Sequence, residues 1–273
     1  MLVAPGVRRI LAPNPSLMTG RGTNSYLFGN GEVAVVDPGP DLPEHVEALI
    51  EASRELGTLT TALVTHWHSD HLPAALTLKR RLGVRLAGHA SLPGVNLALE
   101  DGARCAIGGV VVRAVATPGH TADHQCYLLE ADQVLFSGDH IAGEGTVVIN
   151  PPDGNMAAYL DSLRVVLALN PRLILPGHGP PIEQPTEKLI EYLEHRLARE
   201  RQVLTLLADR PRTVADLVAA IYREVPPALH PVAARSVLAH LLKLEAEGRA
   251  RPSGAPLSIA ARQSIVWEAI SGG

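Results

Sequence analysis

The stretch His66-Trp-His68-Ser-Asp70-His71 decides both the fold and the chemistry of this 273-residue chain. It follows a β-branched, apolar run at residues 59–65, which is typical of a buried strand. His66 and His68 are two residues apart, a spacing that suits extended or tight-loop backbone and lets both rings point the same way, whereas the helical zinc motif places its histidines one turn apart. Asp70 and His71 follow at once, so a turning backbone can direct them to a second ion.

Three further candidate ligands also follow strand-like runs, each directly behind a glycine. Strand ends are where α/β folds usually build their sites, so we expect all seven side chains to meet at one edge of a sheet. The sequence therefore predicts a dinuclear metal centre. The three ligands and the runs before them are His120 after 110–117, Asp139 after 134–137, and His178 after 173–175.

The ligand types bear on the identity of the metal. Imidazole and carboxylate ligands without a thiolate suit Zn²⁺, and the same set is compatible with Mn²⁺ or Fe²⁺. We therefore expect two divalent metal ions as cofactors, with Zn²⁺ favoured. A lone histidine is more often a hydrogen-bonded, half-buried side chain, but seven such residues at four strand ends favour the metal interpretation.

In this order and spacing, the seven residues resemble the ligands of the metallo-β-lactamase superfamily. The resemblance implies an α/β fold, a four-layer αββα sandwich of two mixed sheets flanked by helices. It also implies a role for each ligand. His66, His68 and His120 would hold the first metal ion, Asp70, His71 and His178 would hold the second, and Asp139 would bridge them.

Two positions indicate where the chain lies within this superfamily. The antibiotic-hydrolysing enzymes usually carry Cys at the position of Asp139 and lack His at the position of His71. The resemblance therefore implies the glyoxalase II and ribonuclease side of the superfamily and argues against a β-lactam substrate.

Longer motifs narrow the resemblance to the lactamase beta-like protein 2 family, over nearly the whole chain. One departure is Leu72-Pro73-Ala74, where the family commonly has x-Gly-Gly after the last histidine of the first motif. Pro73 is compatible with the first turn of a helix, so we expect the fold to persist while substrate access near His71 differs. The motifs are GTNSYL at 22–27, VVDPG at 35–39, TPGHT at 117–121, GEGTV at 143–147, LPGHG at 175–179 and LAHLLKLEAEG at 238–248.

A change of pattern near residue 184 predicts two domains, a metallo-β-lactamase-fold hydrolase domain at 1–184 and a small helical domain at 185–273. Thr186 suits the N-cap of a long helix to about residue 208, and Thr213 with Asp216 approximates a capping box. Helical stretches to residue 222 and at about 231–248, with short strand candidates at 250–251 and 265–267, resemble a winged-helix module.

Composition fits a folded globular protein, with 46% hydrophobic and 19% charged residues. No apolar run approaches the roughly 20 residues that span a membrane, and the N-terminal segment lacks the apolar core of a secretory signal. Cys105 and Cys126 lie in apolar, strand-like contexts typical of buried free thiols, so we expect a cytoplasmic protein without a membrane partner. The 3% aromatic content leaves few stacking platforms for bases.

Charge is unevenly distributed. Residues 185–273 carry 12 Lys+Arg and 10 Asp+Glu, which leaves 12 and 18 for residues 1–184. Nucleic-acid binders are usually more basic, so we expect RNA affinity to be weak and salt-sensitive. Arg196, Arg199 and Arg201 could line a face that contacts phosphates. The alternative is a solvated helix face with Glu194 and Glu200 as partners.

The expected mechanism follows from two metal ions roughly 3.5–4 Å apart, which would share a hydroxide formed from water whose pKa they lower. Asp70 is the candidate catalytic residue, since it can ligate one ion and also orient the nucleophile or accept its proton. The family resemblance implies an endoribonuclease that cleaves phosphodiester bonds of single-stranded RNA. The alternative is a glyoxalase II-like thioesterase that hydrolyses a glutathione or CoA thioester with the same metals.

Other residues near the ligands have expected supporting roles. Asp37, at the end of a strand-like run, is expected to accept a hydrogen bond behind the ligands or to form a turn, and not to be a ligand itself. His124 is expected to pack, and for His140 a substrate-facing and a packing position are both open. Asn24 lies in a glycine-rich loop that borders the active-site mouth in the superfamily, where forming a turn is an equal alternative. The remaining histidines are expected to be ordinary surface or packing residues: His45, His89 and His195.

Overall fold

The structure is a computed structural model that describes residues 1–254 and 258–270. The chain divides into two compact units. The first is built on two large sheets, and the second contains a small three-stranded sheet with helices.

A mixed six-stranded sheet forms one layer of the first unit, in the order β1-β2-β3-β4-β5-β6. The pairs β1–β2 and β2–β3 are antiparallel, and the pairs from β3 to β6 are parallel. The strands are β1 (Leu2–Ala4), β2 (Val7–Leu11), β3 (Asn24–Val36), β4 (Gly57–Val64), β5 (Arg85–Gly88) and β6 (Leu97–Ala98).

Strand β3 bends back on itself at two glycines. Gly29 and Gly31 have φ angles of +111° and +77°, which L side chains rarely adopt. The bend brings the two ends of β3 together, because Ser25 Oγ donates a hydrogen bond to the carbonyl oxygen of Asp37 at 2.6 Å. Asn24 at the start of β3 and Asp37 just after its end therefore lie at the same edge of the sheet.

The second layer is a five-stranded sheet in the order β11-β10-β9-β8-β7, antiparallel except for the parallel pair β10–β11. The four strands that the sequence predicted before the ligands are all present, as β4, β8, β10 and β11. The strands of this layer are β7 (Arg104–Ile107), β8 (Val110–Ala116), β9 (Gln125–Leu129), β10 (Val134–Gly138) and β11 (Leu173–Pro176).

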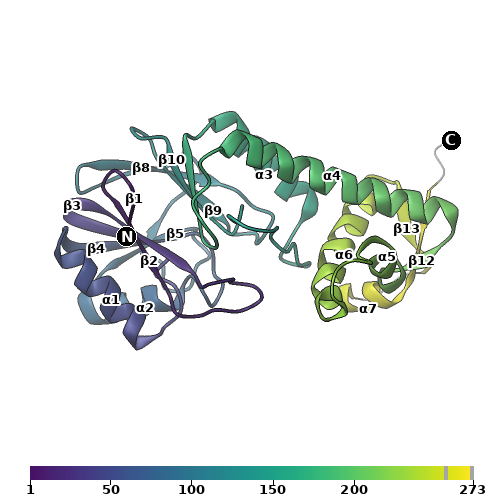
Figure 1. The fold of residues 1–273 in the computed structure, drawn as a ribbon, viewed down its shortest axis with the longest axis horizontal. Helices are drawn as coiled ribbons and strands as arrows, with labels where there is room; N and C mark the ends of the chain where they lie inside the picture. Colours follow the sequence, from purple (N-terminus) through teal and green to yellow (C-terminus); the bar gives the residue numbers. More distant parts are fainter. Residues whose placement is uncertain (255–257, 271–273) are drawn as a thin grey trace. The chain divides into compact units, whose positions relative to one another are not determined.

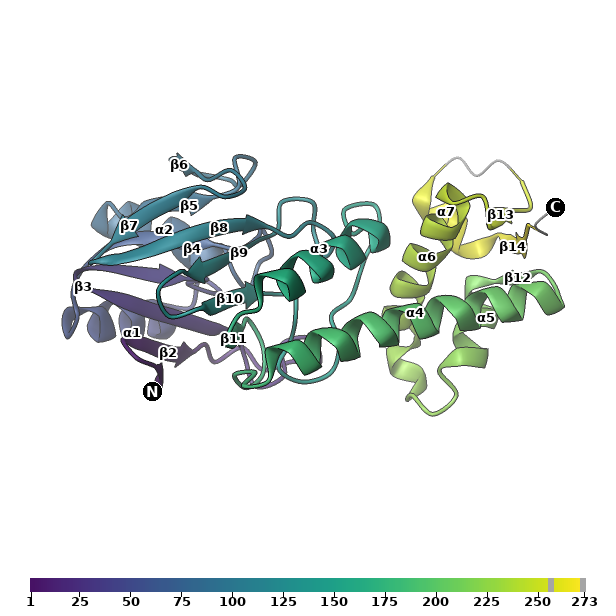
Figure 2. The same ribbon diagram turned by 90° about the horizontal axis from the view of Figure 1, so that it is seen from above.

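The two sheets pack face to face over an apolar core. Successive residues of β3 alternate between two sides, as strand geometry requires: Phe28 and Val36 contact Phe136 and other residues of the inter-sheet core, and Val35 packs on the opposite side. On that side lie α1 (Pro43–Arg54) and α2 (Pro73–Leu82), which cover the outer face of the six-stranded sheet (Figure 1). In Figure 2, seen from above, strands of the two sheets overlap, and α1 and α2 lie farther from the viewer.

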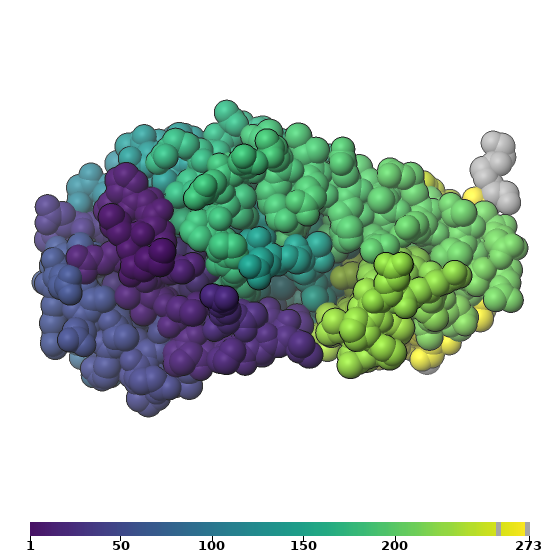
Figure 3. Space-filling view, in the orientation of Figure 1, coloured from purple at the N-terminus to yellow at the C-terminus, as the bar shows by residue number. Residues whose placement is uncertain are grey.

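Helices α1 and α2 are amphipathic. The buried residues of α1, His45, Val46, Leu49 and Ile50, recur with helical spacing, and its other face is part of the surface (Figure 3, indigo). Helix α2 begins at Pro73, so the predicted proline in a first helical turn is confirmed.

Two longer helices follow the strands of the five-stranded sheet in sequence. They are α3 (Met156–Leu169), after β10, and α4 (Pro185–Asp209), after β11. Helix α4 matches the predicted long helix in length, but it begins at Pro185, so Thr186 lies in its first turn and the predicted N-cap is wrong.

The second unit has its own core around Trp267, which is fully buried. The predicted capping box is confirmed: Thr213 Oγ1 accepts from the amide of Asp216, whose carboxylate accepts from the amide of Thr213. The helices are α5 (Val214–Ile221), the short 3₁₀ helix η1 (Pro227–Leu229), α6 (His230–Ala246) and α7 (Ile259–Ser264), and the sheet, in the order β12-β14-β13, comprises β12 (Arg212–Thr213), β13 (Ala250–Pro252) and β14 (Val266–Ala269).

Candidate metal centre

The strand ends that carry Asp139 and His178 meet at one edge of the five-stranded sheet. The parallel pairing of β10 with β11 aligns Gly138 with Pro176, so Asp139 and His178 leave the sheet at the same end. Gly177 lies where a Cβ atom would stand 2.8 Å from His71 Cε1 and 2.9 Å from Asp139 Oδ1. The glycine before His178 is therefore required by the close approach of two other ligands.

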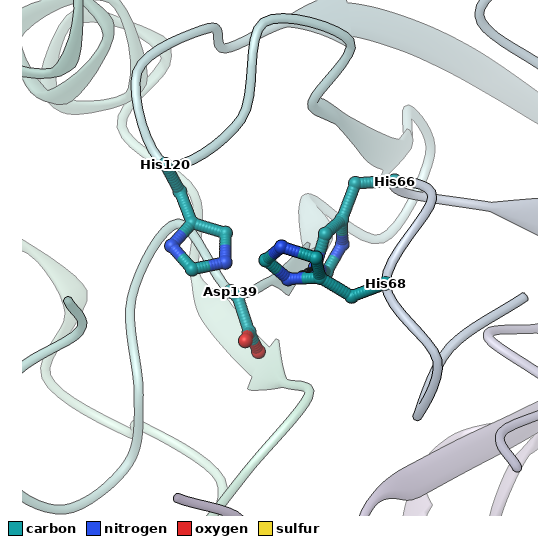
Figure 4. Close-up of side chains that lie close together, drawn as sticks. All are labelled: His66, His68, His120 and Asp139. Atoms are coloured by element: carbon teal, nitrogen blue, oxygen red, sulfur yellow. Dashed lines mark hydrogen bonds between the residues drawn. The ribbon is translucent and has the colours of Figure 1, made fainter. Parts of the chain in front are cut away.

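All seven predicted ligands are brought together, in two groups, which we call the metal edge. Within each group, one ligand atom per residue lies within 4.8 Å of the others. Figure 4 shows the first group, in which three imidazole rings and one carboxylate point toward one another. The first group is His66, His68, His120 and Asp139, and the second is Asp70, His71 and His178.

Asp139 also lies next to the second group. Its Oδ1 atom is 3.2 Å from His178 Nε2 and 3.4 Å from His71 Nε2. The Oδ2 atom of Asp70 is 3.2 Å from the same nitrogen of His178. The two groups thus fit a dinuclear site, with Asp139 in the position expected of a bridging carboxylate.

Four of the five candidate ligand histidines are held by their Nδ1 atoms, which directs Nε2 toward the ligand groups. This is the arrangement found behind most metal-binding histidines, because the outer hydrogen bond fixes both ring orientation and tautomer. The Nδ1 atom of the fifth, His68, instead lies 2.9 Å from His66 Nε2. The four pairs are His66 Nδ1 with Thr65 Oγ1 at 2.9 Å, His71 Nδ1 with Asp37 Oδ2 at 2.9 Å, His120 Nδ1 with the Val148 carbonyl at 2.8 Å, and His178 Nδ1 with the Gly22 carbonyl at 3.3 Å.

Asp37 links the two groups, so its predicted role as a hydrogen-bond acceptor is confirmed. Its Oδ2 atom contacts His71 and also accepts from Thr65 Oγ1 at 2.9 Å, and the same hydroxyl contacts His66. Its Oδ1 atom accepts from the amide of Thr65 at 2.8 Å. Sequence reasoning missed Thr65, although a hydroxyl residue directly before the first ligand was the available signal.

The electrostatics of the edge favour positive charge. Burial alone would raise the pKa of Asp139, but His178 and His71 outweigh it and hold that pKa well below its usual range. Burial likewise favours the neutral form of His178, yet Asp139 and Asp70 raise the pKa of His178 to about 10. Carboxylates that stay ionised, together with imidazoles whose Nε2 atoms face them, form a donor set that fits divalent cations.

Two other histidines support the ligands from behind. His124 packs as predicted, with its ring 5.1 Å from the ring of His66 and its Nδ1 atom 2.8 Å from Thr117 Oγ1. His140 is fully buried, 6.0 Å from the ring of His124. Because no part of His140 reaches the surface, it takes the packing position of the two that the sequence left open.

The arginine face predicted on α4 is wrong in part. Arg196 is only 2% exposed, and its guanidinium lies 5.3 Å above the ring of Tyr159. Glu200, expected as a partner on a solvated face, is 5% exposed. Arg199 stacks on Tyr222 at 4.7 Å, and Arg201 is exposed. Only the last two arginines remain candidates for contact with a phosphate.

The fold and the ligand groups define the class of protein. Residues 18–178 match the Metallo-beta-lactamase superfamily, and residues 213–256 match the Beta-lactamase associated winged helix domain. The chain therefore belongs to the metallo-β-lactamase superfamily, whose members are metal-dependent hydrolases. The predicted α/β sandwich with a C-terminal winged-helix-like domain is confirmed. The domain boundary after residue 184 stays a prediction.

Within the superfamily, the chain is similar to proteins named beta-lactamase-like protein 2 homolog, which confirms the family resemblance. It is 37% identical over 271 residues to the one from Drosophila melanogaster, covering 90% of each chain. It is 34% identical over 258 residues to the one from Caenorhabditis elegans, covering 90% of this chain and 86% of the relative. A crystal structure of a metallo-beta-lactamase family protein from Thermus thermophilus shares the fold, with a TM-score of 0.82, 24% identity and coverage of 98% and 99%.

Across the part of the chain that the structure describes, no helix is both long and apolar enough to cross a bilayer.

Proposed function

We propose that the chain is an endoribonuclease that uses two divalent metal ions, Zn²⁺ being favoured, to hydrolyse phosphodiester bonds of single-stranded RNA. The hydrolase class rests on the superfamily and on the two ligand groups. The choice of RNA follows from the family resemblance of the sequence motifs, and the similarity to proteins named beta-lactamase-like protein 2 homolog, which extends over most of the chain, supports that resemblance.

The observation that carries the substrate class is the exposed indole of Trp67. This side chain lies between the ligands His66 and His68 in sequence and is 48% exposed. Its ring centroid is 4.8 Å from that of His68. A base of a single strand can stack on such a surface while the neighbouring phosphate reaches the ligand groups.

In this proposal, the metal ions would activate water and stabilise the negative charge that develops on the phosphate oxygens. Asp70 orients the nucleophile or accepts its proton. It suits that role because its side chain is 25% exposed, so water can reach it. Although burial favours its neutral form, His71 and His178 lower the pKa of Asp70, which keeps the carboxylate ionised at neutral pH. His71 and His178 fix its position through their contacts with Oδ2.

The test is a substrate panel with protein of measured metal content: single-stranded RNA, double-stranded RNA and S-lactoylglutathione. We expect internal cleavage of single-stranded RNA, and its loss in the Asp139→Asn variant. Efficient hydrolysis of S-lactoylglutathione with RNA left intact would replace the proposal by the thioesterase alternative.

Trp67 provides a direct binding test. The chain has two tryptophans, and Trp267 is fully buried, so quenching by an added ligand reports Trp67. A single-stranded oligoribonucleotide should quench the fluorescence of the catalytically inactive Asp139→Asn protein. The Trp67→Phe variant should retain stacking and cleavage, while Trp67→Leu should raise the Michaelis constant for RNA. Equal Michaelis constants for the Phe and Leu variants would show that Trp67 does not contact a base.

A further inference from the structure

We propose that Asn24 is a positioning residue that holds the His178 loop and thereby sets the affinity of the second ligand group for its metal ion. The inference rests on the two-metal centre of the proposed hydrolase, but not on its substrate, because its test needs metal binding alone. It resolves the open question about Asn24, for which the sequence left a turn-forming role as an equal alternative.

The His178 loop is residues 176–179, and it begins at the last residue of β11. Asn24 is 1% exposed and donates three hydrogen bonds to this loop. Its side-chain Nδ2 atom donates to the carbonyl oxygens of Pro176 and Gly179, both at 2.9 Å. Its backbone amide donates to the carbonyl of Gly177 at 2.8 Å.

These bonds surround the ligand on both sides. The fourth carbonyl of the loop, that of His178, accepts from the amide of Gly143 at 2.9 Å, so each carbonyl of residues 176–179 has a donor. Asn24 supplies the hydrogen-bond donor for three of these four carbonyl oxygens. An asparagine amide has two N–H groups, and both are used here.

The neighbours of Asn24 contact the same ligand. Thr23 forms an isolated β-bridge with His178, and the Gly22 carbonyl accepts from His178 Nδ1 at 3.3 Å. The bend in β3 sets Asn24 beside Asp37, which holds His71. The two ends of one strand thus position two histidines of the same ligand group, one through its loop and one through its ring.

The chemical consequence is specific to the amide. Asn24→Asp preserves the size of the side chain but removes both donors and turns a carboxylate oxygen toward two carbonyl oxygens. The loop must then shift or leave the Gly179 carbonyl without its side-chain donor, which is costly for a buried group. Asn24→Ala removes the same bonds without adding charge. Either change should loosen His178 while leaving His66 and His68 in place.

The matched control is Tyr26→Phe. The Tyr26 hydroxyl donates to the same Pro176 carbonyl, at 2.7 Å, and the residue is also buried. Removing this hydroxyl leaves the carbonyl bonded to Asn24, so the loop should remain fixed. The control therefore distinguishes the loss of any buried hydrogen bond near the site from the loss of the bonds that surround His178.

The experiment is a titration of the metal-free full-length chain with Zn²⁺ in competition with a chromophoric chelator, which gives two dissociation constants. We expect the weaker binding step to weaken by about 10- to 100-fold in Asn24→Asp, the range for residues that support a ligand. Asn24→Ala should show a smaller change in the same direction, and Tyr26→Phe less than about threefold. Thermal unfolding of each metal-free variant measures the general structural effect.

Two results would overturn the proposal. One is a second dissociation constant in Asn24→Ala equal to that of the wild-type chain. The other is a parallel weakening of both constants in step with a lower melting temperature, which would show that Asn24 acts on the fold as a whole. Should Asn24→Asp fail to fold, the alanine variant decides. Loss of RNA cleavage is not a readout here, so failure of the proposed substrate leaves the result interpretable.

Discussion

Buried carboxylates have different kinds of partner at two places in this chain. One place is the metal edge, and the other is a group in the second unit that we call the Glu200 cluster. The cluster consists of Glu200, Lys243, Glu247 and Arg249. Glu200 is 5% exposed and lies 2.8 Å from Lys243 Nζ and 3.1 Å from Arg249 Nη1. Glu247 contacts the same two cations at 2.6 and 3.1 Å. Two carboxylates are thus balanced mainly by a lysine and an arginine, with the buried His240 Nδ1 farther off, 3.8 Å from Glu200 Oε2.

At the metal edge, the carboxylates face titratable partners instead. Asp70 and Asp139 lie 3.2–3.6 Å from the Nε2 atoms of His71 and His178. An imidazole can give up its proton and offer the same nitrogen to a metal ion, whereas lysine and arginine cannot do so near neutral pH. Burial of a carboxylate is common to both places. The type of residue next to it is what distinguishes a cation-binding site from a structural ion pair.

The largest effect that separates the two regions should come from Asp139→Asn. The substitution keeps the volume but removes the charge that allows two cations to lie close together. We expect loss of one metal ion per chain, and a fall in turnover larger than the roughly 100-fold cost of altering a supporting residue. Elemental analysis and a cleavage assay measure both. The exposed residue Asp41 supplies the control, Asp41→Asn, which should change neither. Normal metal content in Asp139→Asn would exclude the bridging role.

The corresponding change in the Glu200 cluster is Glu200→Gln. Burial favours the neutral acid, but His240 and Lys243 lower the pKa of Glu200 to about 2. Because this value lies below the ordinary value of about 4.3 for an unfolded chain, the ionised form stabilises the fold above that pH. The stabilisation is lost as the pH falls from about 5 to about 2. We expect Glu200→Gln to lower the free energy of unfolding by about 2 kcal/mol at pH 7, below the full cost of a broken buried pair because Arg249 is partly exposed.

Denaturant unfolding of the whole chain in a Trp67→Phe background measures this effect, since Trp267 then reports the second unit alone. The difference in stability between the chain that keeps Glu200 and the Glu200→Gln variant should shrink toward zero between about pH 5 and pH 2. Metal content should be unchanged. A difference that is constant across this pH range would show that the charge of Glu200 is not what stabilises the cluster.

A smaller effect at the metal edge is expected from Asp37→Asn. An amide in this position can no longer accept from both His71 and the Thr65 hydroxyl with the strength of a carboxylate. Metal affinity should fall by about 10- to 100-fold. His89→Ala is the matched control, because His89 is bonded locally to Ser91. His45 is a poor control despite its expected packing role, since it is buried and contacts Ser25, whose hydroxyl binds the Asp37 carbonyl.

The candidate metal ligands could be found from sequence because they are local features, histidines and aspartates clustered just after strand-like runs. The groups behind them could not. Thr65 and Asp37 meet across two parallel strands, Asn24 meets the His178 loop from more than 150 positions away, and the carbonyls of Gly22 and Val148 carry no side-chain signal. The capping box and the strands follow from short-range rules, so they were predicted correctly.

The arginines of α4 were also affected by partners that lie far away in the sequence. Their spacing on a charged helix favoured an exposed face, but the burial of Arg196 depends on Tyr159, which is 37 positions earlier in the chain. Periodicity gives the face of a helix on which a residue lies and not the partner that covers it. Glu200 was wrongly expected on a solvated face for the same reason. Its ion-pair partners come from later in the chain, Lys243 from α6 and Arg249 from the segment between α6 and β13.

The smallest expected effect comes from Arg201, a charged residue that is part of neither the metal edge nor the Glu200 cluster. Arg201 is exposed on α4, so Arg201→Gln should not alter metal content or stability. If it contacts a phosphate of single-stranded RNA, the Michaelis constant should rise by less than about threefold at low salt, and the slope of log affinity against log salt should fall by about 0.7, the value for one contact with a single strand. Arg196→Gln, at a buried position over Tyr159, should instead lower the melting temperature and leave the slope unchanged. A slope unaltered in Arg201→Gln would remove α4 from the RNA contact surface, and would leave the metal edge and Trp67 as the places where RNA is held.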